Sequence, residues 1–162
     1  MGLFGISITK NSDIDNLTLV DISKKALEIV EKNLIKNNIK TNYSIIHSNL
    51  FEKLNKNVKY DIIVSNPPYI KTSDLDNLSD YVKNEPMLAL DGGEDGLIFY
   101  RKILQEAMLF LNDNSVILFE IGYDQKEDIV FLINEFKEYE VIECMQDLGM
   151  NDRVIVCRFH KI

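Results

Sequence analysis

The sequence lacks any run of about 18 consecutive apolar residues, and it does not begin with a charged segment followed by a long apolar one. We therefore expect neither a membrane span nor a secretory signal peptide, and we expect a cytoplasmic protein. Cysteine is scarce, and Cys144 and Cys157 stand apart from each other and from any histidine cluster. Such cysteines are typical of reduced core thiols, so no metal site is expected.

The sequence is also short of positive charge. It has 18 Lys and Arg against 26 Asp and Glu, which gives a net charge of -8. A surface that neutralises a phosphate backbone normally carries an excess of Lys and Arg. Direct binding of nucleic acid by this chain is therefore not expected.

Hydrophobic residues make up 46% of the 162 positions, enough for the core of one domain over residues 1–162. Short apolar runs alternate with helical patterns, which indicates an α/β fold with a mostly parallel sheet. The last two strands predict an antiparallel hairpin that closes the sheet. The expected strands are 17–20, 43–47, 60–65, 115–120, 140–145 and 153–159, and the expected helices are 23–37, 97–111 and 126–136.

A long polar segment, residues 70–95, separates the third expected strand from the next helix. Segments of this length in compact domains usually carry function. The acidic pair Glu94 and Asp95 within it is expected to be a solvated face.

Two expected strands end in residues suited to a nucleoside. Asp21 follows the first strand and precedes a helix, where a carboxylate in doubly wound folds binds a ribose diol about 20 residues after a glycine-rich loop. Gly2 precedes Asp21 by 19 positions. Asn49 follows the second strand, where its amide can bond an adenine amino group while Leu50 packs on the ring. The alternatives are an acidic helix cap at Asp21 and a plain Asx turn at Asn49.

The sequence Asn66-Pro67-Pro68-Tyr69 ends the third expected strand, at the sheet edge where α/β folds bind ligands. An amide NH2 is a poor nucleophile, so a site that methylates it must accept its hydrogen bonds and hold its nitrogen in line with a sulfonium methyl group. The Asn66 side-chain oxygen and the Pro67 carbonyl are candidate acceptors, and Tyr69 would pack on the planar amide. The alternative is a turn that only ends the strand.

These residues belong to a longer pattern that spans nearly the whole chain and resembles the release factor glutamine N5-methyltransferases, the HemK/PrmC family. The tetrapeptide alone is shared with adenine-N6 methyltransferases. The matching positions are 20–23, 26–27, 65–70, 85–86, 89–90, 92–93, 95–97, 100–101, 120–122, 125, 147–149 and 152–154.

The resemblance implies a Rossmann-like fold that uses S-adenosylmethionine to methylate the glutamine of the Gly-Gly-Gln motif in a peptide chain release factor. By this resemblance, Asn66, Pro67, Pro68 and Tyr69 bind and activate the acceptor glutamine, and Asn66 also adjoins the cofactor. The remaining cofactor contacts would be Gly2, Asp21, Asn49 and Leu50, and Asn49 stands where the family usually has Asp.

The family carries an N-terminal helical domain, then a central strand and a glycine-rich loop. Residues 1–8 match only the end of that loop and its helix, with Gly2 as the last loop glycine, so we expect the first strand to be missing. Each backbone group left buried and unpaired would cost roughly 1 to 3 kcal/mol. The flanking strands closing on each other, a strand lent by another chain in a homodimer, or a longer natural protein would each compensate.

Three functions compete at this point. A release factor glutamine methyltransferase is favoured by the whole pattern. An adenine-N6 nucleic-acid methyltransferase is favoured by the tetrapeptide but opposed by the acidic charge. A catalytically silent fragment is favoured by the missing loop.

Overall fold

A computed structural model describes residues 3–79 and 86–162. The chain divides into two compact units, Met1–Lys56 and Asn57–Ile162, and each is described by itself. Over the described ranges, no helix combines the length and apolar character needed to span a membrane.

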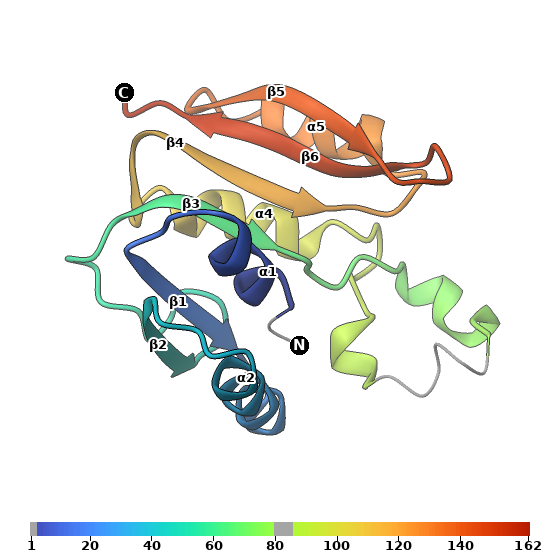
Figure 1. The fold of residues 1–162 in the computed structure, drawn as a ribbon. Helices are drawn as coiled ribbons and strands as arrows, with labels where there is room; N and C mark the ends of the chain where they lie inside the picture. Colours follow the sequence, from blue (N-terminus) through green and yellow to red (C-terminus); the bar gives the residue numbers. More distant parts are fainter. Residues whose placement is uncertain (1–2, 80–85) are drawn as a thin grey trace. The chain divides into compact units, whose positions relative to one another are not determined.

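The first unit is a βαβ arrangement preceded by a short helix. It contains α1 (Leu3–Asn11), β1 (Asn16–Asp21), α2 (Lys24–Lys36) and β2 (Asn42–His47). The two strands pair in parallel, with Asp21 opposite His47. Helix α2 runs alongside this two-stranded sheet (Figure 1).

Helix α2 begins and packs as its sequence predicts. The Ser23 side chain caps it by accepting a hydrogen bond from the Ala26 amide at 3.3 Å. Four of its apolar residues recur at the spacing of one helix face and are buried, and two of them, Val30 and Leu34, form a small core with Ile6 of α1. The buried residues of α2 are Ala26, Leu27, Val30 and Leu34.

The second unit is a four-stranded sheet with two helices on one face (Figure 1). The strand order is β3-β4-β6-β5, in which β3 and β4 are parallel and the other two pairs are antiparallel, so the predicted closing hairpin is confirmed. The elements are β3 (Tyr60–Ser65), α4 (Ile98–Ala107), β4 (Leu111–Glu120), α5 (Lys126–Asn134), β5 (Tyr139–Gln146) and β6 (Asp152–Phe159), with short 3-10 helices at Thr72–Asn77 and Met87–Ala89.

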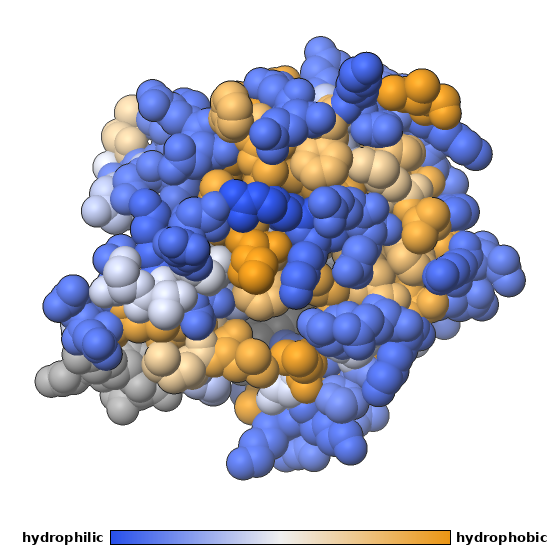
Figure 2. Space-filling view, turned by 180° about the vertical axis from the view of Figure 1, so that it is seen from behind, coloured by the Kyte–Doolittle hydropathy of each residue, from blue (hydrophilic) through white to orange (hydrophobic). Residues whose placement is uncertain are grey.

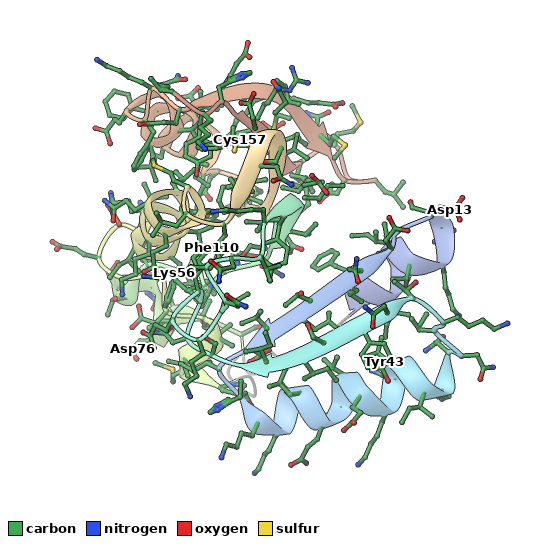
Figure 3. All side chains as sticks on the ribbon, turned by 90° about the vertical axis from the view of Figure 1, so that its left-hand side faces the viewer. Asp13, Tyr43, Lys56, Asp76, Phe110 and Cys157 are labelled. Carbon is green, nitrogen blue, oxygen red and sulfur yellow. The ribbon has the colours of Figure 1, made fainter. Side chains whose placement is uncertain are left out.

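The core of the second unit lies between this sheet and the two helices. Phe119 of β4 is fully buried and meets the Tyr100 ring edge-on, with 5.3 Å between ring centroids. Cys157 of β6 is fully buried too (Figure 3), and burial raises the pKa of its thiol to about 12. The predicted core position is therefore right for Cys157, whereas Cys144 is only half-buried; both thiols are free.

Helix α4 is shorter than predicted. It ends at Ala107, because the Phe110 amide bonds to the Ala107 carbonyl at 2.8 Å and turns the chain. Strand β4 then begins at Leu111, earlier than the expected residue 115. Apolar residues continue through this turn, so nothing in the sequence marks where the helix stops.

The described strands form two sheets rather than one continuous sheet. Among described residues, β1 pairs only with β2, and β3 pairs only with β4. Each therefore has one edge without a strand partner in the described part of the chain. Apolar side chains reach the surface at several places (Figure 2), and those of Val20 in β1 and Ile62 in β3 are 37% and 53% exposed.

Candidate active site

The predicted acceptor turn, Asn66–Tyr69, directly follows β3. The strand ends at Ser65, which pairs with Phe119 of β4. Asn66 is exposed, and within the described chain its side chain has no hydrogen-bond partner, whereas Pro67 is buried. The turn therefore combines an exposed asparagine side chain with a buried proline directly after it.

The long segment after the turn folds back onto it. The Ile70 amide donates to the Leu90 carbonyl at 3.0 Å, and the Gly92 amide donates to the Ile70 carbonyl at 2.7 Å. These bonds use both the amide and the carbonyl of Ile70, so the backbone is held directly after the turn as well as directly before it.

A buried glutamine provides a further contact to the turn. The Gln125 side chain, 5% exposed, donates from Nε2 to the Tyr69 carbonyl and accepts from the Gly122 amide, each at 3.0 Å. Gly92 and Gly96 allow the close packing, because a Cβ on Gly92 would lie 2.7 Å from the Tyr69 Cα and one on Gly96 would lie 2.5 Å from the Tyr69 oxygen. The sequence analysis gave Gln125 no role, although position 125 was among those that match the family pattern.

Tyr100 of α4 supports the neighbouring strand end. Its hydroxyl donates to the Glu120 carbonyl at 2.8 Å. Burial, together with the nearby Tyr69, raises the pKa of this phenol far above its usual value. Tyr100 is therefore a neutral, permanent hydrogen-bond donor.

Two carboxylates of the segment are structural anchors. Asp95 forms a bidentate ion pair with Arg101 and accepts the Leu97 amide at 3.0 Å, so this half-exposed residue makes specific contacts in addition to facing solvent. The bond from Arg101 lowers the pKa of Asp95. The Thr72 hydroxyl, followed by the Gly93 amide, lowers the pKa of Asp91 in the same way.

In the first unit, Asp21 lies at the carboxyl end of β1 as predicted. Its Oδ1 accepts the Ser23 amide at 2.8 Å, and Oδ2 has no hydrogen-bond partner within the described chain. The helix cap itself is Ser23, so Asp21 is not the cap residue. His47 Nε2 lies 2.8 Å from the Ile22 carbonyl and holds the connection between strand and helix.

Asn49 and Leu50 form a tight turn after β2. The Asn49 amide nitrogen donates to Glu52 at 2.7 Å, which leaves its Oδ1 as the atom suited to an adenine amino group. Leu50 has a φ of 46°, a left-handed conformation uncommon for leucine. The buried Ser48, which sequence reasoning passed over, ties this turn down by accepting the Lys53 amide at 3.0 Å.

The structure thus groups Asp21 with the turn at Asn49, because the Ser48 amide donates to the Asp21 carbonyl at 3.1 Å. It groups Asn66–Tyr69 with Gln125 in the other unit. Gly2, the predicted loop glycine, lies outside the described residues. Among the residues that are described, no cluster of His, Cys, Asp and Glu suits a metal ion.

Residues 1–144 match the family described as the methyltransferase small domain. A release factor glutamine methyltransferase from Fusobacterium nucleatum subsp. nucleatum is 39% identical over 97% of this chain and 44% of its own length. A ribosomal protein uL3 glutamine methyltransferase from Francisella tularensis subsp. tularensis is 39% identical over 76% of this chain and 39% of its own length. The chain thus spans less than half of either relative.

A crystal structure of a methyltransferase from Pyrococcus furiosus has a similar fold, with a TM-score of 0.72 at 18% identity over 99% of this chain and 71% of that one. This likeness establishes a Rossmann-like methyltransferase fold. The family match covers most of the sequence and includes both predicted groups of site residues. The chain therefore belongs to the methyltransferase small domain family.

Proposed function

We propose that this chain is the catalytic part of an S-adenosylmethionine-dependent methyltransferase that modifies the side-chain amide nitrogen, N5, of a protein glutamine. The observation that carries the proposal is the acceptor turn. Asn66 presents an exposed amide without a partner in the described chain, at the end of β3 and beside the buried Pro67. A planar amide needs such acceptors around its NH2 group.

The turn's own groups account for the chemistry. The Asn66 oxygen and the Pro67 carbonyl accept the two N–H bonds of the substrate amide and orient its nitrogen. S-adenosylmethionine supplies an electrophilic methyl group on sulfur. As the N–C bond forms and the S–C bond breaks, positive charge develops on nitrogen, where the two acceptors stabilise it, and the excess proton leaves to water. Loss of one such acceptor lowers the rate on the order of 10²-fold or more.

The residues of the first unit suit the nucleoside of the cofactor. Asp21 keeps Oδ2 available for a ribose hydroxyl, since Oδ1 is occupied by the Ser23 amide. Asn49 keeps Oδ1 available for the adenine amino group, since its nitrogen is occupied by Glu52. Leu50 supplies an apolar surface for the ring.

A peptide chain release factor, methylated in its Gly-Gly-Gln motif, is the substrate we favour. Similarity to the release factor enzyme extends over 97% of this chain, against 76% for the uL3 enzyme. The net charge of -8 opposes the adenine-N6 alternative, because nucleic acid would be repelled.

The test is transfer of labelled methyl from S-adenosylmethionine to three acceptors: a release factor, the same factor with Gly-Gly-Asn in place of Gly-Gly-Gln, and an adenine-containing oligonucleotide. We expect label only in the first, reduced on the order of 10²-fold by Asn66→Ala and unaffected by Asn134→Ala, a matched change at an exposed asparagine of α5. Label in the oligonucleotide would favour the adenine-N6 enzyme, and label in neither substrate would favour a silent fragment.

A further inference from the structure

We infer that Gln125 is a positioning residue that orients the acceptor turn through its hydrogen bond to the Tyr69 carbonyl. We call this hydrogen bond the grip. The inference rests on the proposed function for its catalytic consequence, whereas the grip itself is a property of the second unit alone. Gln125 precedes α5 in the sequence by one residue, and Tyr69 ends the acceptor turn, 56 positions earlier.

The two hydrogen bonds of Gln125 allow only one orientation of its amide. An N–H donor at Gly122 requires the side-chain oxygen, and the carbonyl of Tyr69 requires the side-chain nitrogen. Turning the amide over would oppose donor to donor and acceptor to acceptor in a place that is 5% exposed. Gln125 therefore binds a specific pair of backbone groups, which a hydrophobic residue of the same length cannot do.

The base of this contact is rigid. The Gln125 amide bonds to the Gly122 carbonyl at 3.1 Å, and the Gln125 carbonyl receives the first-turn bond from Ile129 of α5 at 3.0 Å. Glycines flank the side-chain amide, because a Cβ on Gly122 would lie 2.8 Å from its Oε1 and one on Gly96 would lie 2.7 Å from its Nε2. The space around Gln125 is thus shaped to a planar amide.

The grip matters because the acceptor turn is a short span between two fixed points. One is Ser65, held by its pairing with Phe119, and the other is the peptide that joins Tyr69 to Ile70. Pro67 and Pro68 lie between them and have no N–H with which to tie the backbone down. The orientation of the Tyr69 carbonyl thus helps to set the direction in which Asn66 and the Pro67 carbonyl face.

The substitution Gln125→Glu tests the positioning role, because pH decides whether the introduced side chain can donate to the Tyr69 carbonyl. In its ionised form, the introduced carboxylate still accepts the Gly122 amide but turns a second oxygen without a proton toward the Tyr69 carbonyl. Once protonated, the same side chain donates O–H to that carbonyl and restores the grip. Because the site is buried, protonation should occur well above the ordinary value of about 4.3. The substitution Gln125→Met keeps the length and makes neither bond at any pH, and Gln105→Glu, at an exposed position of α4, is the surface control.

The measurement is the carbonyl ¹³C shift of Tyr69 and the amide shift of Ile70, followed by NMR from pH 8 to pH 5 in the intact chain without cofactor or substrate. We expect the Gln125→Glu signals to titrate toward the native positions as pH falls, the Gln125→Met signals to stay displaced, and the Gln105→Glu signals to match the native chain. A scalar coupling from Gln125 Nε2 to the Tyr69 carbonyl in the unaltered chain gives the same information if a variant does not fold.

For methyl transfer, we expect Gln125→Met to lower kcat about 10- to 100-fold with little change in the KM for S-adenosylmethionine, and Gln125→Glu to approach the native kcat only at the acid end. The hydrogen bond from Gln125 to Tyr69 would be contradicted by absence of the scalar coupling. It would also be contradicted if the Gln125→Glu and Gln125→Met variants both showed native chemical shifts at every pH. Displaced shifts with an unchanged kcat would overturn the positioning role. Titrating shifts in a chain that methylates nothing would instead uphold the grip and reject the proposed function.

Discussion

The two compact units differ most in how their strands are buried. In the first unit, no residue of β1 or β2 is fully buried, and the core is formed mainly by helix residues such as Val30 and Leu34. In the second unit, β4 lies between β3 and β6, and its Ile117 and Phe119 are 0% exposed. A strand with partners on both edges and helices on one face is stabilised much more than a strand in a two-stranded sheet.

The proposed site is divided along the same line. Several contacts within the second unit hold the predicted acceptor turn: the Ser65 pairing, the Ile70 bonds and the hydrogen bond from Gln125. Asp21, by contrast, belongs to β1, whose second edge has no partner among the described residues. The residues proposed to bind the acceptor thus follow a strand of the better supported sheet, whereas those proposed to bind the cofactor follow strands of the two-stranded sheet.

The sharpest contrast is expected when the units are produced separately. Residues 57–162 should unfold cooperatively in urea, whereas residues 1–56 should lack a cooperative transition, because a two-stranded sheet with one small core is marginal alone. Circular dichroism during urea titration measures both. Cooperative unfolding of residues 1–56 alone would show that the two units do not differ in this way.

The next largest effect is expected from Gly96→Ala in the second unit. Gly96 combines a positive φ of 77° with a Cβ position 2.5 Å from the Tyr69 oxygen. We expect a loss of about 3 kcal/mol in the free energy of unfolding. Gly93→Ala shares the positive φ, 88°, but its Cβ would meet only Ile98 at 3.3 Å, so about 1 kcal/mol is expected. Equal losses in urea unfolding would mean that the packing against Tyr69 is not tight.

The loop carboxylates should make the second unit sensitive to acid. The bond from Arg101 lowers the pKa of Asp95 in the folded state below its unfolded value of about 3.9. A lowered folded pKa contributes stability that is present above the unfolded value and is lost as pH falls through the folded value. We expect the melting temperature to decline below about pH 4 and to decline less in Asp95→Asn, which should start slightly lower at pH 7. Parallel curves would contradict this.

The smallest effect concerns the first unit. Asn49→Asp replaces the hydrogen bond to Glu52 by repulsion between two carboxylates, which should cost a few tenths of a kcal/mol because the pair is near the surface. Asn49→Asp with Glu52→Gln should recover the loss. The same change should strengthen S-adenosylmethionine binding, because a charge-assisted bond to the adenine amino group is stronger. Urea unfolding and calorimetric titration check the two effects.

Much of the fold follows from local pattern. Helix α2 agrees with prediction down to its cap, Ser23, and its buried face, because capping and helical periodicity are set by nearby residues. Strand β3 has the predicted bounds, since Pro67 and Pro68 cannot continue a ladder. The end of α4 was wrong by four residues, because the turn at Phe110 contains no glycine or proline to announce it.

The site was predictable only in part. The positions of Asp21 and Asn66 at strand ends were predicted correctly, and their roles stay predictions that rest on a fold whose ligands bind at strand ends. Gln125 and Ser48 were missed because their partners, Tyr69 and the Lys53 amide, are set by tertiary packing or by a turn that no motif marks. The ion pair of the half-exposed Asp95 was not predicted for the same reason, since its pairing with Arg101 depends on how α4 begins.

Calorimetric titration of the 162-residue chain with S-adenosylmethionine tests the central claim most directly. We predict saturable binding with one site, greatly weakened in Asp21→Ala and unchanged in Asp124→Ala, a matched change at an exposed aspartate of the second unit. No binding at millimolar cofactor, or equal binding by the chain and its Asp21→Ala variant, would contradict the assignment of the cofactor to the carboxyl end of β1.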